Sequence, residues 1–210
     1  TRTRTRQCWS LVGRALVGLV ALNAAPTAAQ TWLPIARVDH PPAMDGTLSD
    51  PVWRQTTRFT AFRTLHPQVG REPSESTEVY LAYDHENLYV AVGSHDRGAD
   101  SIRAAATDAN SAWHDDWVAF CLDPQDGGLD AYYFLVTPAG FAVAGVLGFD
   151  GGPVQTLDRA WSSRVTRAPD GYAVQLVIPL AQLPYPPGDT VRMAFKLARA
   201  ISRRDEEMDF

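Results

Sequence analysis

Apolar and polar residues alternate along much of this 210-residue chain, most clearly between Thr77 and Asp123. Val79, Leu81 and Tyr83 fall on one face of a predicted strand, because strand side chains point alternately to its two sides. A polar turn over 84–87 follows, and alternation resumes over 88–92. The pattern predicts two antiparallel strands joined by a tight turn.

Two further hairpins are predicted from turn chemistry. Residues 131–136 and 141–147 flank a turn with Pro and Gly, and so do 161–166 and 172–178. The stretch 117–123 is apolar on both faces, as in a central strand, whereas 97–112 is polar and irregular, as in a long loop. A short edge-like strand is expected over 35–38, a weak strand over 58–63, and the last strand over 191–202. About ten short strands with short helical turns predict an all-β fold, an antiparallel β-sandwich.

Residues 1–29 have the layout of a secretory signal peptide. Arg2, Arg4 and Arg6 form a basic start, 11–22 is mostly apolar, and small residues lead to Ala29, after which cleavage is expected. We therefore expect an exported protein, whose domain covers 30–202. The last residues, 203–210, are interpreted as the start of a further C-terminal domain.

Charge excludes some partners. The first 29 residues hold four of the 19 basic residues and no acidic one, so 15 basic residues face 24 acidic ones in the remainder, near −9. This excess disfavours nucleic acid and anionic membranes. No stretch from Gln30 on approaches the length of a membrane span, so direct membrane insertion is not expected.

Aromatic and acidic residues gather before the predicted strand 117–123. Trp113 follows a small, polar loop, and a rim indole there can stack on a sugar ring while its N–H bonds a hydroxyl; folding back over the core is the alternative. Trp161 is a second candidate platform, with packing at the sandwich edge as its alternative. Asp116 is expected either to accept hydroxyl hydrogen bonds from a sugar or to order the loop.

The acidic residues also raise the question of a metal. Asp96, Asp115 and Asp123 are candidate calcium ligands, although their spacing is not that of a calcium-binding loop. Asp115 and Asp116 cannot form a close pair, because adjacent strand residues point to opposite faces. No other cofactor is expected. Cys121, between Phe120 and Leu122, is interpreted as a packing residue.

The order of these residues resembles the family 9 carbohydrate-binding modules from about Ile35 to Ala200. The resemblance rests on Asp45-Gly46, Asp50, Trp53, Asp84, Leu88-Tyr89-Val90, Asp96, Trp113, Asp116, Val118, Asp123, Gly171-Tyr172 and Ile178-Pro179. It implies a β-sandwich that binds oligo- or polysaccharides between stacked tryptophans, with bound calcium. Trp113 corresponds to one of these tryptophans, and Ala119 stands where the sugar-binding members have Glu.

The chain resembles one subgroup of these modules more closely than the family as a whole. Asp116-Trp117-Val118, Ala131-Tyr-Tyr-Phe134, Pro138-Ala-Gly140 and Arg203-Arg204-Asp-Glu-Glu207 resemble exported bacterial proteins in which such a module precedes a large β-rich domain of outer-membrane type. The resemblance implies a location in the periplasm or outer membrane and a role in polysaccharide catabolism. It also implies that the further C-terminal domain is a partner of this module.

Three functions are therefore open. The first is a non-catalytic carbohydrate-binding module of an envelope protein. The second, favoured by Ala119, is a ligand-free structural domain that docks onto the further domain. The third is part of a glycoside hydrolase, an O-glycosyl hydrolase, although no pair of carboxylates can be assigned as acid and nucleophile.

Overall fold

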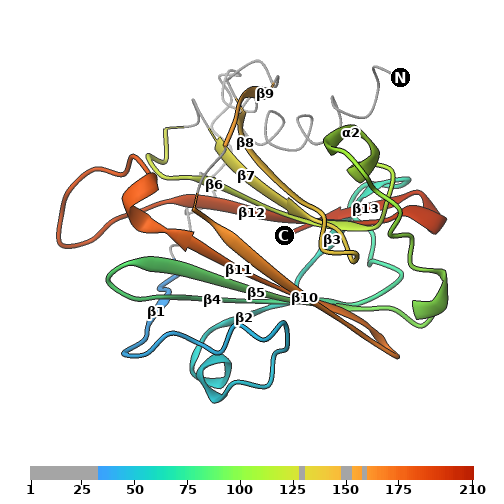
Figure 1. Ribbon diagram of the computed structural model, residues 1–210, viewed down its shortest axis with the longest axis horizontal. Coiled ribbons are helices and arrows are strands. Elements are labelled where there is room, and N and C mark those ends of the chain that lie inside the picture. Colours follow the sequence, from blue (N-terminus) through green and yellow to red (C-terminus); the bar gives the residue numbers. More distant parts are fainter. Residues whose placement is uncertain (1–32, 128–130, 148–152, 158–159) are drawn as a thin grey trace, which may run out of the picture.

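In the computed structural model, which describes residues 33–127, 131–147, 153–157 and 160–210, thirteen strands form two stacked sheets (Figure 1). Residues 1–29, the predicted signal peptide, lie outside the described residues. The helical elements are short: η2 (Pro51–Gln55), η3 (Ala99–Ser101), α2 (Ala109–Ala112), η4 (Leu180–Gln182) and η5 (Ser202–Arg204). The predicted all-β sandwich is confirmed.

Six strands form sheet A, in the order β1-β4-β5-β11-β10, with β2 beside β4. Their bounds are β1 (Ala36–Arg37), β2 (Arg58–Phe59), β4 (Thr77–Tyr83), β5 (Asn87–His95), β10 (Ser162–Ala168) and β11 (Gly171–Pro179). The β1–β4 pair is parallel and the other pairs are antiparallel. The predicted hairpins β4–β5 and β10–β11 are both present.

Seven strands form sheet B, in the order β3-β13-β12-β6-β7-β8-β9. Their bounds are β3 (Arg63–His66), β6 (Trp117–Asp123), β7 (Ala131–Val136), β8 (Ala142–Leu147), β9 (Pro153–Thr156), β12 (Ala194–Ile201) and β13 (Glu206–Asp209). Strand β6 is central, as its apolar faces predict. The weak strand predicted over 58–63 is two short strands, β2 and β3, which belong to different sheets.

The sandwich extends past residue 202, the predicted end of the domain. Strand β13 pairs with β12 and with β3, and the Phe210 ring lies 5.2 Å from the Phe59 ring, centroid to centroid. Met208 is buried, while Glu207 and Asp209 alternate with Met208 and Phe210. Residues 203–210 therefore contribute a strand to this domain, because β12 and β3 supply hydrogen-bonding partners on both of its sides.

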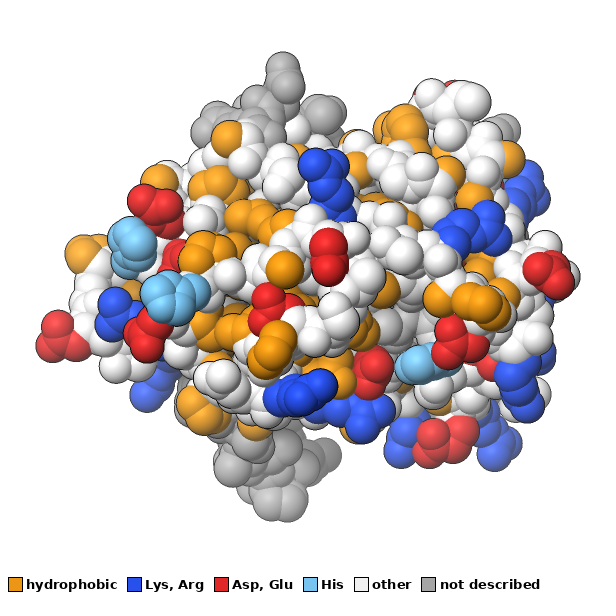
Figure 2. All heavy atoms as spheres, turned by 60° about the horizontal axis from the view of Figure 1, so that its bottom comes forward, with side chains coloured by type: hydrophobic (Ala, Val, Ile, Leu, Met, Phe, Trp, Pro, Cys, Tyr) orange, Lys and Arg blue, Asp and Glu red, His pale blue; other side chains and the backbone are white. Residues whose placement is uncertain are grey.

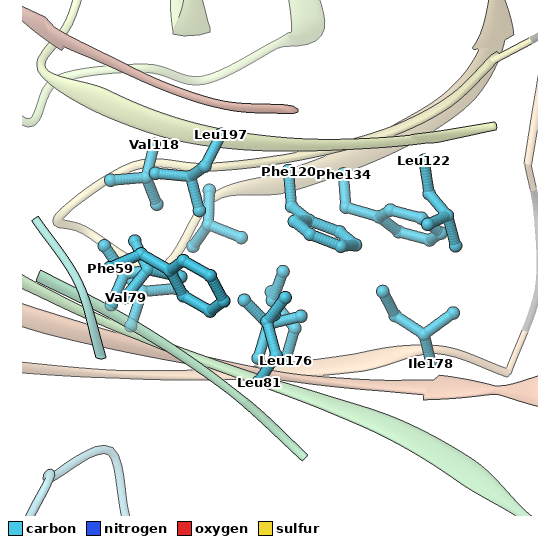
Figure 3. Close-up of a cluster of buried hydrophobic side chains, with 14 of the residues drawn as sticks. Phe59, Val79, Leu81, Val118, Phe120, Leu122, Phe134, Leu176, Ile178 and Leu197 are labelled. Carbon is cyan, nitrogen blue, oxygen red and sulfur yellow. The ribbon is translucent and has the colours of Figure 1, made fainter. Parts of the chain in front are cut away.

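The main core lies between the sheets (Figure 3). Val79, Leu81, Leu176 and Ile178 of sheet A face apolar side chains of sheet B, as alternation requires. The facing residues labelled in Figure 3 are Val118, Phe120, Leu122, Phe134 and Leu197. Burying one such side chain contributes about 1.5–3 kcal/mol, so this layer is the main source of stability.

The N-terminal segment covers the outer face of sheet A. Asp50 caps η2, accepting a hydrogen bond from the Val52 N–H at 2.8 Å, and the helix carries Trp53 onto Tyr89 and Ala91. Trp53 is 2 % exposed, so it anchors this segment to sheet A by packing. On this side of the molecule acidic and basic side chains intermingle (Figure 2).

Candidate functional site

The helical turn α2 positions Trp113. Its N-cap residue Asp108 accepts a hydrogen bond from the Ser111 N–H at 2.8 Å, and the Ser111 hydroxyl accepts one from the Asp108 N–H at 3.0 Å. Hydrogen bonds from the backbone and the side chain of Ser111 to the Asp108 carboxyl lower the pKa of that carboxyl. This reciprocal capping box fixes a turn too short to be stable alone, and Trp113 is its C-cap residue.

The Trp113 ring is half-buried and lies among other aromatic rings. Its centroid is 5.3 Å from that of Trp117, with the planes at 75°, and 6.3 Å from that of Tyr133. The edge-to-face contact with Trp117 is a favourable aromatic geometry. Trp113 therefore combines a partly exposed ring with a fixed orientation.

These rings lie on the outer face of sheet B, which is apolar. Residues Trp117, Ala119 and Cys121 alternate with the core residues of β6, so they point away from the core. Cys121 is buried, which confirms its predicted packing role. The other buried members of this face are Ala112, Tyr133, Leu135, Leu147, Ala198 and Ala200. Ala119 lies in the middle of this face, so no carboxylate projects there.

Trp161 lies elsewhere. Its ring contacts that of Phe134 at 5.4 Å, at 70°, and it packs against the core between the sheets. Phe134 and Tyr133 are neighbours in β7 and point to opposite faces, so Trp161 and Trp113 are separated by sheet B. The structure does not bring the two tryptophans together around one ligand.

Asp116 and Asp115 are both buried, and both hold the segment that leads to Trp113. Asp115 Oδ2 accepts hydrogen bonds from the N–H groups of Ala105 and Ala106, each at 2.6 Å. Asp116 Oδ1 accepts one from the Ser202 N–H at 3.0 Å and a longer one from the Arg103 N–H. Two roles were predicted for Asp116, and its contacts with backbone N–H groups match the ordering of the loop.

Burial shifts the pKa of Asp116. Removal of the carboxylate from water raises this pKa, and the hydrogen bonds of Ser202 and Arg103 and the charge of Arg199 lower it by less. Its pKa therefore lies above the ordinary value of an aspartate. Asp116 is 0 % exposed, so its carboxylate does not reach a surface ligand.

The candidate calcium ligands Asp96, Asp115 and Asp123 do not form one site, because each binds different protein groups. Asp96 accepts hydrogen bonds from Arg203 Nη2 at 2.6 Å and from the Gly98 N–H at 2.7 Å. Asp123 accepts one from the Gln125 N–H in a turn, and Asp115 binds the loop described above. Within the described ranges, no three His, Cys, Asp or Glu side chains are grouped as a metal would require. These residues do not fit a calcium ion.

Two surface hollows lie near the segments that contain Asp96 and His114. One, of about 440 Å³, is lined by residues that include Glu75, His95 and Asp170; the other, of about 450 Å³, is lined by Arg103, His114, Ser202 and Asp205. His114 follows Trp113, so the second hollow adjoins the same segment. Sequence reasoning missed both hollows, because loops far apart in the chain form them.

A buried charge network was also missed. Glu75 contacts Arg97, Arg203 and Arg204, and Asp96 lies between Arg203 and the fully buried Arg199. The signal available was Arg199 itself, a charged residue in the inward-facing row of the last predicted strand.

Among the helices that the structure describes, none is long and apolar enough to cross a membrane.

Comparison with known proteins shows which structures and which family this chain resembles. The structure is similar to family 9 carbohydrate-binding modules from Caldicellulosiruptor kristjanssonii, one in complex with cellotriose and one with glucose. The first is 16 % identical, with a TM-score of 0.58 over 83 % of this chain and 80 % of that one; the second is 17 % identical, with 0.57 over 82 % and 84 %. A third similar structure is that of a protein from Bacteroides uniformis to which carbohydrate binding has been assigned. It is 16 % identical, with a TM-score of 0.53 over 71 % of this chain and 76 % of that one.

No curated protein is similar enough to count as a match. The family model described as "Carbohydrate family 9 binding domain-like" matches residues 44–207. This span runs from the segment before η2 into β13 and so includes most of both sheets. The chain therefore belongs to the carbohydrate family 9 binding domain-like family.

Proposed function

We propose that this chain is a non-catalytic carbohydrate-binding module in which Trp113 stacks on a sugar ring. The observation that carries the proposal is the half-buried Trp113 ring, fixed edge-to-face on Trp117 by a capped helical turn. A rigid, partly exposed indole is suited to the apolar face of a pyranose, because little side-chain freedom is lost on binding. Family membership supports the same function.

The proposed ligand is an oligosaccharide or polysaccharide built of glucose-like units. Two modules of similar fold are known in complex with cellotriose and with glucose. Exposed polar side chains near Trp113, those of Asn110 and His114, are available to bind hydroxyl groups. One stacking contact with few polar partners implies weak affinity.

The wider setting is also proposed. Residues 1–29 would direct export to the periplasm or outer membrane, and a further β-rich domain after this module would act with it in polysaccharide catabolism. The signal-peptide layout and the resemblance of 203–207 to the fused subgroup support this setting.

A second function, docking without a ligand, rests on a different observation. The centre of the outer face of sheet B is apolar, with Ala119 and Leu135, whereas a sugar needs polar partners. A further domain of the same protein would be the occupant. The third function, part of a glycoside hydrolase, has the least support, because Asp96, Asp115 and Asp116 all serve structural contacts.

The experiment that tests the first function is a titration of residues 30–210 with cellotriose and with glucose, followed by tryptophan fluorescence. A saturable change that Trp113→Ala abolishes and Trp161→Ala retains supports the proposal. Both variants lose a half-buried tryptophan, so each serves as the other's control, with folding verified by circular dichroism. No saturable change in folded protein favours docking.

A further inference from the structure

At one end of the interior, the apolar rows of sheet A give way to polar side chains. Thr77 is paired with Ser94, and Ser94 with Tyr172, so the three lie side by side across β4, β5 and β11. Each continues the inward-facing row of its strand, and each is at most 3 % exposed. This polar row therefore faces sheet B and not solvent.

Arg199 reaches this row from sheet B. Its Nη1 donates to the Ser76 carbonyl and to Thr77 Oγ1, each at 2.9 Å, and its Nη2 donates to the His95 carbonyl at 2.8 Å. Its guanidinium carbon lies 5.8 Å from the centre of the Tyr172 ring. The Nε–H of this fully buried side chain has no hydrogen-bond partner.

Asp116 enters the same region from the start of β6. Its Oδ1 is satisfied by the N–H groups of Ser202 and Arg103, whereas its Oδ2 has no partner. The charges of Asp116 and Arg199 both act on the Tyr172 hydroxyl, and burial raises the pKa of that hydroxyl. Ser94 and Arg199 lie near this hydroxyl, but neither forms a hydrogen bond of normal geometry with it.

Four neighbouring residues thus carry buried polar atoms without partners: Asp116 Oδ2, Arg199 Nε, Tyr172 Oη and Ser94 Oγ. Each such atom left unsatisfied costs about 1–3 kcal/mol. Native proteins avoid this cost, and where protein groups do not suffice, an ordered water or an ion completes the hydrogen bonds. Four such atoms in one region point to a common partner.

The chemistry of the four atoms selects the partner. Asp116 Oδ2 only accepts, Arg199 Nε only donates, and the two hydroxyls of Tyr172 and Ser94 do either. Water offers two donors and two acceptors and matches this set. The Arg199 cation disfavours a metal ion, and the carboxylates of Asp116 and Asp96 disfavour an anion.

We propose that Asp116 Oδ2, Arg199 Nε, Tyr172 Oη and Ser94 Oγ bind one internal water molecule. This water links Asp116 to sheet A. Because Asp116 also binds the Arg103 N–H and the Ser202 N–H, the site ties segment 103–116, which carries Trp113, to both sheets. The inference stands independently of carbohydrate binding.

Oxygen-17 magnetic relaxation dispersion counts long-lived internal waters in solution. We expect Tyr172→Phe to have one fewer than wild type. Tyr89→Phe is the matched control: it removes another buried tyrosine hydroxyl, which donates to Asp84 at 2.6 Å on the other face of sheet A. An equal count in wild type and a folded Tyr172→Phe protein would overturn the proposal.

A high-resolution crystal structure of the wild-type protein decides the matter even if the variants do not fold. Density for a water about 2.7–3.2 Å from at least three of the four atoms is expected. Three outcomes would overturn the proposal. They are direct hydrogen bonds among the four side chains, no density between them, and an ion at the roughly 2.3–2.6 Å typical of calcium.

Discussion

Trp113 and Trp161 lie on opposite faces of sheet B, because they contact adjacent residues of one strand, Tyr133 and Phe134. Two tryptophans on opposite faces cannot clamp one sugar ring between them. Any stacking by Trp113 is therefore one-sided, unless a part of the protein outside the described residues supplies a second ring. The two indoles also differ in role: Trp113 packs on the outer apolar face of sheet B, and Trp161 packs against the core between the sheets.

Trp161→Ala is expected to destabilise the protein without removing a ligand-binding group. Its half-buried ring packs on Phe134 and the inter-sheet core, so its loss leaves a partial cavity and costs about 2 kcal/mol. Urea unfolding measures this change. An unaltered unfolding midpoint would mean that the Trp161 ring does not pack against the core in solution.

Gln175→Leu is expected to release the segment that covers sheet A. The buried amide accepts a hydrogen bond from the Gly46 N–H at 2.7 Å and donates to the carbonyls of Thr47 at 2.7 Å and Ala43 at 3.1 Å. Leucine leaves these backbone groups unpaired, for a loss of roughly 2–4 kcal/mol.

Hydrogen exchange read by mass spectrometry tests this release. Faster exchange should appear in the peptide around Gly46 and not in β6 or β12. Gln68→Leu, at an exposed position, is the control that changes the same side chain without these contacts. Equal protection of the Gly46 peptide in both variants would show that Gln175 does not hold this segment.

Alternation in the sequence was sufficient to predict the central strands and hairpins. Val118, Phe120 and Leu122 form the inward row of β6, and extending that row by one step places Asp116 inside as well. The sequence alone did not favour that placement, because burying a carboxylate is costly unless partners such as the N–H of Ser202, distant in sequence, are supplied.

Long-range contacts also explain the other differences. Strand β13 forms because β12 and β3 offer open edges on both of its sides, which no local pattern in 203–210 reveals. The side on which Trp161 packs depends on how β10 meets sheet B, and each of the two surface hollows is lined by three separate parts of the chain. Local patterns predict elements and not their spatial neighbours.

Gly171→Ala is expected to be strongly destabilising. Gly171 has φ of +139°, and an added Cβ would lie 2.0 Å from the Ser94 carbonyl oxygen. Backbone strain and this clash together should cost more than about 2 kcal/mol. The change would also disturb the end of β5 that contributes to the polar interior.

Gly140→Ala is the matched control for this substitution. Gly140 also has positive φ, +83°, but nothing lies within 4 Å of an added Cβ. It should cost only the left-handed backbone penalty of roughly 1–2 kcal/mol. Thermal unfolding of both variants measures the difference, and equal losses would mean that Gly171 is not crowded by Ser94.

The pair Asp96–Arg203 is expected to make stability depend on pH in the acid range. Burial raises the pKa of Asp96, but the hydrogen bonds of Arg203 and the Gly98 N–H, with the charges of Arg203 and Arg199, outweigh it, so the folded pKa lies below 3.8. The folded protein then binds this proton less readily than the unfolded chain does. The stabilisation is full above pH 3.8 and disappears as pH falls through the lowered pKa.

Asp96→Asn should therefore lower the free energy of unfolding at neutral pH, and the difference from wild type should shrink as pH falls below 3.8. Urea unfolding at a series of pH values measures this dependence. Asp100→Asn removes a carboxylate from the exposed surface four residues away and serves as the control. A difference between Asp96→Asn and wild type that stays constant across this range would contradict an ionic role for Asp96, since only a charged carboxylate loses its contribution on protonation.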